Sequence, residues 1–201
     1  MLLSSESLVA ELDSVLSRAP TTKPAAILRG MLDLFVSGAA TFSRQHVAIF
    51  DDLFIRLIDK VDAELLSVLS QRLASISNPP NKLLDHLSRN DEISISGPIL
   101  SQSPALGEET LCEIARTKGQ LHLAAVASRP QITEKLTDIL IDRGHPDIAH
   151  KLACNPGARL SMRGFSKLIK RAETDRTLAD ALSGRSDLPN ELRPFLVLAS
   201  S

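Results

Sequence analysis

The chain has 201 residues, which is long enough to bury the core of one large domain or of two small ones. Apolar residues make up 43% of it, which argues against disorder, and the absence of Trp and Tyr favours helices packed through aliphatic side chains. Its 23 basic and 24 acidic residues leave a net charge of −1, which gives no general attraction to nucleic acid or to anionic membranes.

Residues 1–75 predict four helices. The first covers Glu6 to Ser17 and the second covers Pro24 to Val36, with a proline in the first turn, where its missing N–H costs nothing. Ser43 is the expected N-cap of the third helix, and Asp62 is that of the fourth. The third helix has a broad apolar face, made of Val47, Phe50, Phe54, Leu57, Ile58 and Val61.

His46 lies in the first turn of the third helix and precedes acidic residues, a pattern shared with phosphorelay sites. At about 100° per residue, however, its side chain projects together with Phe50 and Leu57 onto the apolar face. Because a phosphoacceptor must meet its partner in solvent, we interpret His46 as a histidine at the edge of the core. A phosphorylated histidine is the alternative, and it requires His46 to be exposed.

Residues 76–201 carry a repeat, which we recognise by an interval of 26 residues kept at several positions. The interval separates the prolines Pro104, Pro130 and Pro156, and likewise the positions Leu100, Val126 and Leu152. The expected N-caps are Asn81, Gly107 and Thr133, followed two residues late by Ser161. Each unit predicts two short helices, and no such unit buries its apolar face alone. We therefore expect an all-α fold in which HEAT-like units stack into a short α-solenoid.

Two local signals within the repeat need interpretation. The stretch Glu92–Pro98 alternates like a strand, but the register of the repeat places it on a helix, and we follow the register. Gly119 and Gly144 are expected to end helices in a left-handed conformation. After Ser161 the interval lengthens, and a last helix over residues 188–198 is expected to cap the stack.

Four separated blocks of the chain resemble a known family. They are residues 50–58 (FDDLFIRLI), 97–106 (GPILSQSPAL), 111–117 (LCEIART) and 152–161 (LACNPGARLS). In this order they look like a conserved alphaproteobacterial family of unknown function with HEAT-like helical repeats, over residues 45 to 165. The resemblance implies an all-helical repeat fold and a bacterial cytoplasm, and it supplies no catalytic residues. Gly107 stands where the resemblance leads us to expect a serine cap.

The stretch Arg159–Arg185 contains seven basic and three acidic residues, and several of the basic ones follow helical spacing. We take this stretch as the candidate surface for a partner. Its candidate binding residues are Arg159, Arg163, Lys167, Lys170 and Arg171. The alternative is an ordinary charged solvent face, because local charge is common and aromatic stacking partners are missing.

No phosphate loop, nucleophile elbow or paired-acid motif occurs in the sequence. We interpret the adjacent Asp51 and Asp52 as part of a solvated helix face. His145 and His150 are spaced five apart, which does not place two metal ligands on one helical face. Cys112 and Cys154 form no metal-ligand motif and are interpreted as reduced thiols packed in helices. We therefore expect no enzymatic activity, no cofactor and no metal.

These observations predict a cytoplasmic, non-catalytic module or scaffold that binds another protein. Residues 1–75 are expected to form a helical cap on the repeats of residues 76–201. One alternative is a nucleic-acid-binding helical repeat that uses the basic stretch, and another is a signalling module with a phosphorylated histidine. No apolar run is long enough to span a bilayer, and no signal peptide is expected.

Overall fold

The computed structural model describes residues 23–199, and this part of the chain contains twelve α-helices and no β-strand. The predicted all-α fold is therefore confirmed, whereas the helix expected at residues 6–17 lies outside the described residues. Contacts divide the chain into two compact units. The first ends at Ile99 and also holds Ser103–Leu106, and the second holds Leu100–Gln102 and continues from Gly107. No helix between residues 23 and 199 is long and apolar enough to cross a membrane.

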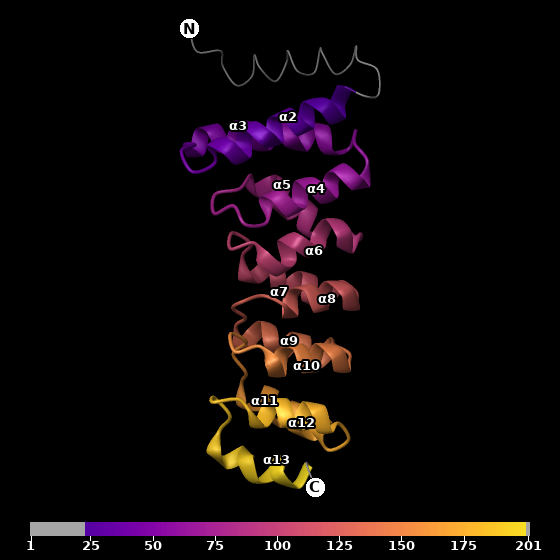
Figure 1. Cartoon of the computed structure of the whole chain (residues 1–201), viewed down its shortest axis with the longest axis vertical. Helices are drawn as coiled ribbons and strands as arrows, with labels where there is room; N and C mark the ends of the chain where they lie inside the picture. The colour runs from indigo at the N-terminus through magenta and orange to yellow at the C-terminus, as the bar shows by residue number, and fades with distance from the viewer. Residues whose placement is uncertain (1–22, 200–201) are drawn as a thin grey trace. The chain divides into compact units, whose positions relative to one another are not determined.

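The first unit is built from paired helices (Figure 1). They are α2 (Lys23–Gly38), α3 (Arg44–Ile58), α4 (Ala63–Leu73), α5 (Asn81–Ser88) and α6 (Ile93–Gln102), whose last three residues belong to the second unit. α2 packs on α3 and α4, and α5 packs on the same two helices. Ser43 and Asp62 are the N-caps of α3 and α4, as predicted, and each accepts a hydrogen bond from a backbone N–H in the first turn.

The start of α5 corrects two sequence-based interpretations. Its N-cap is Pro80 rather than Asn81, and proline has no side-chain acceptor for the first N–H groups. The carboxylate of Asp51 on α3 supplies one instead, because it accepts from the N–H groups of Lys82 and Leu83 at 2.9 Å each. Asp51 is only 6% exposed. Its interpretation as part of a solvated face was wrong: this carboxylate fixes α5 onto α3.

α6 is helical through its Gly-Pro sequence, as the register predicted and the local alternation did not. Pro98 lacks an N–H, so it cannot donate to the carbonyl of Ser94 four residues earlier. The hydroxyl of Ser67 on α4 donates to that carbonyl at 2.8 Å. A side chain of the neighbouring helix therefore replaces the hydrogen bond that the proline removes.

The second unit stacks its helices in two rows (Figure 1). Its elements are α7 (Glu108–Thr117), α8 (Gln120–Ala127), α9 (Glu134–Arg143), α10 (Pro146–Cys154), α11 (Met162–Ala172), α12 (Arg176–Ser183), the short 3₁₀ helix η1 (Asn190–Leu192) and α13 (Arg193–Ala199). α7, α9, α11 and α13 pack one on the next in the first row, and α8, α10 and α12 do so in the second. Within this unit each helix contacts the equivalent helix of the following pair, as in an α-solenoid.

The predicted register holds in the core of the second unit. Val126 and Leu152 are both fully buried at 0% exposure, and Leu100 is equally buried. Gly107 and Thr133 are N-caps as expected, and Ser161 caps α11 two residues late. The interval of the repeat therefore corresponds to equivalent core positions.

A ladder of side-chain donors follows the second row. Arg129, after α8, donates from Nη1 to the carbonyl of Leu100 at 2.8 Å. Asn155, after α10, donates from Nδ2 to the carbonyls of Ala127 at 3.3 Å and of Arg129 at 2.8 Å. Arg185, after α12, reaches the end of α10 in the same way. Each donor satisfies carbonyls at the end of the helix one repeat earlier, where intrahelical partners are missing.

The prediction of left-handed glycines was wrong. Gly119 has a φ of −83° and Gly144 a φ of −74°, and no described residue has a positive φ. Gly144 is required for a different reason, since a Cβ there would lie 2.5 Å from the carbonyl oxygen of Leu140. At Gly157 a Cβ would lie 1.8 Å from the carbonyl oxygen of Pro130. These two glycines permit close backbone approach.

Candidate functional site

Two of the predicted binding residues are paired inside the chain. Arg163 donates from Nη2 to the Oδ2 of Asp142 on α9 at 2.8 Å, and Lys167 contacts the other oxygen of the same carboxylate. The hydrogen bond from Lys167, followed by the charges of both basic residues, lowers the pKa of Asp142 below its ordinary value. The two basic residues therefore share a single carboxylate of the preceding helix pair, which offsets one of their two positive charges.

Arg171 also serves the fold. Its guanidinium lies against the end of α9 and donates to the carbonyls of Ile141 at 2.6 Å and of Gly144 at 3.2 Å. Arg143, 28 residues before Arg171, makes the same kind of contact with the end of α7, where it donates to the carbonyl of Lys118 at 3.1 Å. Both arginines occupy the last turn of a first-row helix, so their recurrence could have indicated a packing role from the sequence.

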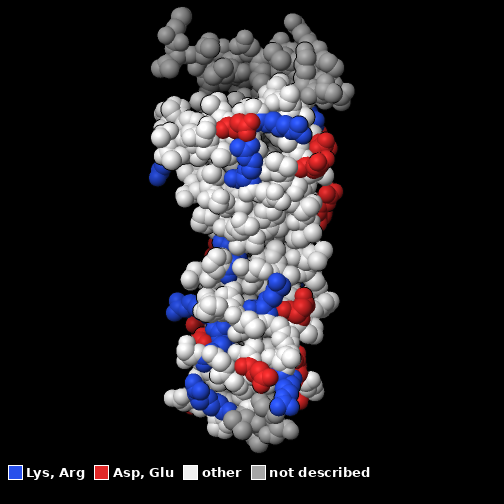
Figure 2. Space-filling view, viewed as in Figure 1, with Lys and Arg blue, Asp and Glu red and all other residues white. Residues whose placement is uncertain are grey.

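The remaining two candidates are exposed to solvent. Arg159 is exposed on the loop before α11, and Lys170 is exposed on α11 itself. Among the described residues, no hydrogen bond or ion pair involves the ammonium group of Lys170. On the face that Figure 2 shows, blue and red side chains lie next to one another and do not gather into a surface of one sign. Of the five predicted residues, Arg163, Lys167 and Arg171 thus contact groups of the chain itself, and Arg159 and Lys170 are exposed.

A small apolar hollow lies beside Lys170, where α13 packs on α11. We call it the α11–α13 hollow. Its volume is about 290 Å³, and it is lined by Ser166, Ile169, Lys170, Glu173, Leu192 and Phe195. Phe195 is 59% exposed, which is unusual for a ring of this size, and Met162 on the same side of α11 is 54% exposed. The chain thus presents apolar side chains to solvent between a basic and an acidic residue.

Of the residues that line this hollow, the sequence pattern predicts Lys170 as a binding residue but does not indicate Glu173, Leu192 or Phe195. The missing signal was the spacing of Leu192 and Phe195 on the last helical segment, which places both side chains on one side. The sequence pattern predicts only a capping role for this segment. α13 does pack on α11 and α12, but it leaves Phe195 largely in solvent.

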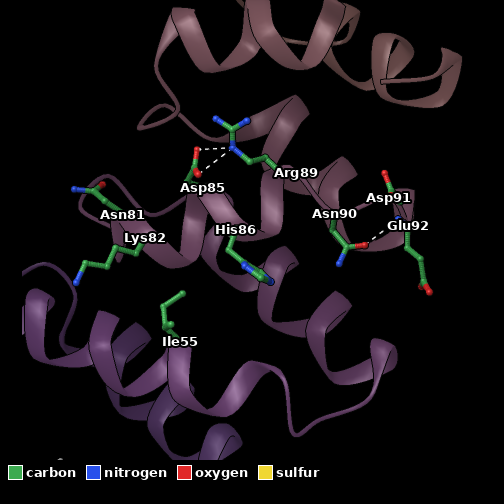
Figure 3. A pocket seen from close by; sticks show the side chains of 9 residues that line it. All are labelled: Ile55, Asn81, Lys82, Asp85, His86, Arg89, Asn90, Asp91 and Glu92. Atoms are coloured by element: carbon green, nitrogen blue, oxygen red, sulfur yellow. Dashed lines mark hydrogen bonds and ion pairs between the residues drawn. The ribbon is translucent and has the colours of Figure 1, made fainter. Parts of the chain in front are cut away.

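The larger hollow of the first unit has a polar lining (Figure 3). It measures about 890 Å³. It is lined by Ile55, by Asn81, Lys82, Asp85 and His86 on α5, by Arg89 at the C-cap of this helix, and by the loop residues 90–92. Its main charges are paired within the chain. Arg89 contacts Asp85 at 3.0 Å, and Lys82 contacts Asp52 at 2.6 Å. Figure 3 shows the imidazole ring of His86 apart from the Asp85–Arg89 pair. A ligand here would have to compete with these ion pairs, so we favour the α11–α13 hollow.

Comparison with known proteins assigns the chain to a family. A family described as an uncharacterised protein conserved in bacteria (DUF2336) matches residues 95–201. The chain belongs to the DUF2336 family. No curated protein and no solved structure matched the chain. The DUF2336 match covers three of the four blocks that indicated a family and excludes the first block, residues 50–58.

The DUF2336 region includes the α11–α13 hollow but not the polar hollow beside α5. It also contains both cysteines. Cys112 is buried, and burial raises the pKa of its thiol, whereas Cys154 at the end of α10 is exposed. The interpretation of two packed thiols therefore holds for Cys112 and was wrong for Cys154.

Of the three histidines of the DUF2336 region, His122 is buried on α8, and the other two lie on and directly before α10. His150 contacts Asp175 through Nε2 at 2.7 Å, and His145 is the exposed N-cap of α10. Within the described residues, no group of three or more His, Cys, Asp or Glu is arranged to hold a metal ion.

His46 lies outside the DUF2336 match and is exposed. Its ring packs edge-on against Phe42, with the ring centroids 5.8 Å apart, and Phe42 in turn stacks on Phe50 at 5.3 Å. The expected place at the edge of an apolar cluster is therefore correct, but the imidazole is open to solvent. His46 therefore has the exposure to solvent that a phosphorylated histidine requires.

Proposed function

We propose that this DUF2336 protein is a non-catalytic module that binds another protein through the α11–α13 hollow. The observation that carries the proposal is Phe195, an aromatic side chain that is 59% exposed over an apolar hollow. Exposed apolar patches rimmed by polar residues are typical of protein-binding surfaces, and aromatic side chains dominate the binding energy of such surfaces. The stacked helix pairs of the second unit provide the rigid support that a binding surface needs.

The charges at the hollow define the chemistry of the partner. Lys170 suits an acidic group, and Glu173 suits a basic one. The surface expected from the sequence was more basic, but Arg163 and Lys167 share the carboxylate of Asp142, which offsets one of their two charges. We therefore propose a partner segment with apolar residues and charges of both signs, such as a helix or a tail. Rim charges steer association more than they add affinity, so binding should weaken with salt without disappearing.

Affinity capture from the native bacterium tests this proposal with a matched pair of variants. Phe195→Ser removes the aromatic side chain at the hollow. Leu121→Ser removes a side chain on α8 that is similarly exposed, at 66%, and lies outside the hollow. We expect Phe195→Ser to lose the partner and Leu121→Ser to retain it, with unchanged helical signals for both. Equal capture by wild type and Phe195→Ser would place the binding surface elsewhere.

We also propose that the stacked pairs are HEAT-like repeats, that the family is alphaproteobacterial and that the protein acts in the cytoplasm. These proposals rest on the resemblance of the sequence blocks and on the two-row packing of the second unit. Nucleic-acid binding is less well supported, because Arg163 and Lys167 share one carboxylate and Arg171 binds backbone carbonyls.

A second candidate function is phosphate transfer through His46, which its exposure favours. A phosphohistidine is labile in acid and stable in base. This function predicts that the wild-type chain incorporates radioactive phosphate in an acid-labile form. The His46→Gln variant should lose this incorporation, and the His86→Gln variant should retain it. His86 is the matched control because it is another exposed histidine of the first unit. Incorporation that is equal in the wild type and His46→Gln would rule His46 out as the phosphorylated residue.

A further inference from the structure

The α11–α13 hollow carries two opposite charges within one helical turn. Lys170 and Glu173 both line it. Lys170 lies in the last turn of α11 and Glu173, three residues later, is the C-cap of this helix with helical backbone angles, so the two side chains project from the same side. Within residues 23–199, no hydrogen bond or ion pair joins the charged groups of these two side chains to each other or to another residue. The apolar surface between α11 and α13 is thus flanked by a cation and an anion that are both available to a partner.

This arrangement is self-complementary under two-fold symmetry. In a two-fold contact, residue i of one copy meets residue j of the other, and j meets i. If two α11 helices cross in antiparallel orientation midway between these residues, Lys170 of each copy lies opposite Glu173 of the other. Two ion pairs then form from one pair of residues.

We infer that the partner in the hollow is a second copy of this chain, an inference that rests on the proposed function. A partner of one sign would satisfy only one of the two charges and would leave the other facing a like charge or buried without a partner. A second copy satisfies both and brings two exposed Phe195 rings to the same contact. Aromatic pairs contribute beyond the apolar area that they bury.

The contact is small and therefore weak. Each copy contributes one exposed ring and one pair of charges, whereas a permanent dimer buries a surface of about 2,000 Å² or more. We expect a monomer–dimer equilibrium that becomes visible at concentrations between about 1 μM and 1 mM. Salt weakens it by screening the two ion pairs.

Sedimentation velocity of the purified full chain over this concentration range tests the inference. The wild type and the control Leu121→Ser are expected to shift from monomer to dimer as the concentration rises. Phe195→Ser should weaken the association about tenfold or more, because it removes the aromatic anchor. A wild type that stays monomeric throughout, or a dimer that Phe195→Ser does not weaken, overturns the inference.

Charge exchange gives a sharper test of the geometry. Lys170→Glu alone and Glu173→Lys alone each place like charges opposite one another, so each variant should dimerise less than the wild type. An equimolar mixture of these two variants should associate again, since every contact then joins unlike charges. The double exchange in one chain should also restore self-association. Failure of both the mixture and the double variant to restore it excludes the two-fold arrangement.

The outcomes separate this inference from the proposed function. If the full chain is monomeric but Phe195→Ser still loses a captured protein, the hollow binds a different protein and the second copy is excluded. If Phe195→Ser changes neither self-association nor capture, the proposed function fails together with the inference. If the wild type is monomeric and a fragment such as residues 1–22 protects the hollow when added as a peptide, the chain covers its own hollow and the inference is overturned.

Discussion

Replacement of Arg185 by Leu is expected to destabilise the second unit severely. Arg185 is 8% exposed and donates to the carbonyls of Leu152 at 3.0 Å, Asn155 at 2.9 Å and Ala158 at 2.7 Å. Its guanidinium also forms a two-bond ion pair with Asp187, at 2.8 and 2.7 Å. Leucine retains the apolar volume but donates no hydrogen bond, so the carbonyls at and just after the end of α10 lose the donor that Arg185 supplies.

The expected loss follows from these contacts. Arg185 also donates to a fourth carbonyl, that of Ala153 at 3.3 Å, whereas the carbonyls of Leu152 and Asn155 each keep a backbone N–H donor. A buried acceptor left without a donor costs about 1–3 kcal/mol, and the carbonyls of Ala153 and Ala158 are the ones affected in this way. The ion pair adds little, because Asp187 is half exposed. We expect a loss of about 3–5 kcal/mol in the free energy of unfolding, the range observed when one partner of a buried charged network is removed.

Urea unfolding followed by far-UV circular dichroism measures this loss. The matched control is Arg176→Leu, because Arg176 is exposed on α12, and it should change the free energy of unfolding by less than about 0.5 kcal/mol. An Arg185→Leu variant that is no less stable than Arg176→Leu would show that side-chain donors do not hold the ends of the second-row helices.

Three further predictions concern the repeat. Leu152→Ala should lower the free energy of unfolding by about 2–4 kcal/mol, and Val126→Ala should lower it by less. Urea unfolding measures both losses. A negligible loss in either variant would contradict the assignment of both residues to the same core position. Gly157→Ala should lower the melting temperature, because a backbone oxygen would lie 1.8 Å from the new Cβ. Gly30→Ala should raise it, because Gly30 is a helical glycine on α2 with open space around it. Equal shifts of the melting temperature in both variants would refute the close approach at Gly157. Two basic neighbours lower the pKa of Asp142 in the folded chain. The contribution of the ionised Asp142 to the free energy of unfolding is therefore complete above the ordinary pKa of 3.8, and it is lost as the pH falls through the lowered pKa of the folded state. Acid unfolding of Asp142→Asn should therefore show a smaller loss of stability below this pH than the wild type, and an equal loss would contradict the ion pair.

The repeat could be predicted because its signals are local or periodic. A hydroxyl before an apolar helical pattern identified Ser43 and Ser161 as N-caps. The interval of 26 residues placed Val126 and Leu152 in the core and Pro98 on a helix, against its local pattern. A period that recurs at independent positions outweighs the preference of any short stretch.

Contacts between successive helix pairs could not be predicted in the same way. Asp51 caps a helix that begins 30 residues later, and Asp142 neutralises a lysine 25 residues later. Nothing within either local stretch indicates such a partner. For this reason the basic residues of α11 looked like one solvent face, although Arg171 turns back to the end of α9. The exposure of Phe195 likewise depends on how α13 packs, which the spacing of its apolar residues leaves open.

Hydrogen–deuterium exchange tests most directly whether the α11–α13 hollow is the binding surface. Exchange is measured on the full chain alone at low concentration and in its isolated complex, whether that complex is a dimer or contains another protein. We expect slower exchange in the complex over residues 162–173 and 190–196, which line and flank the hollow, and no change over α8. Protection confined to α8 or to the face of α5, with none over α11 and α13, would contradict the assignment of the binding surface.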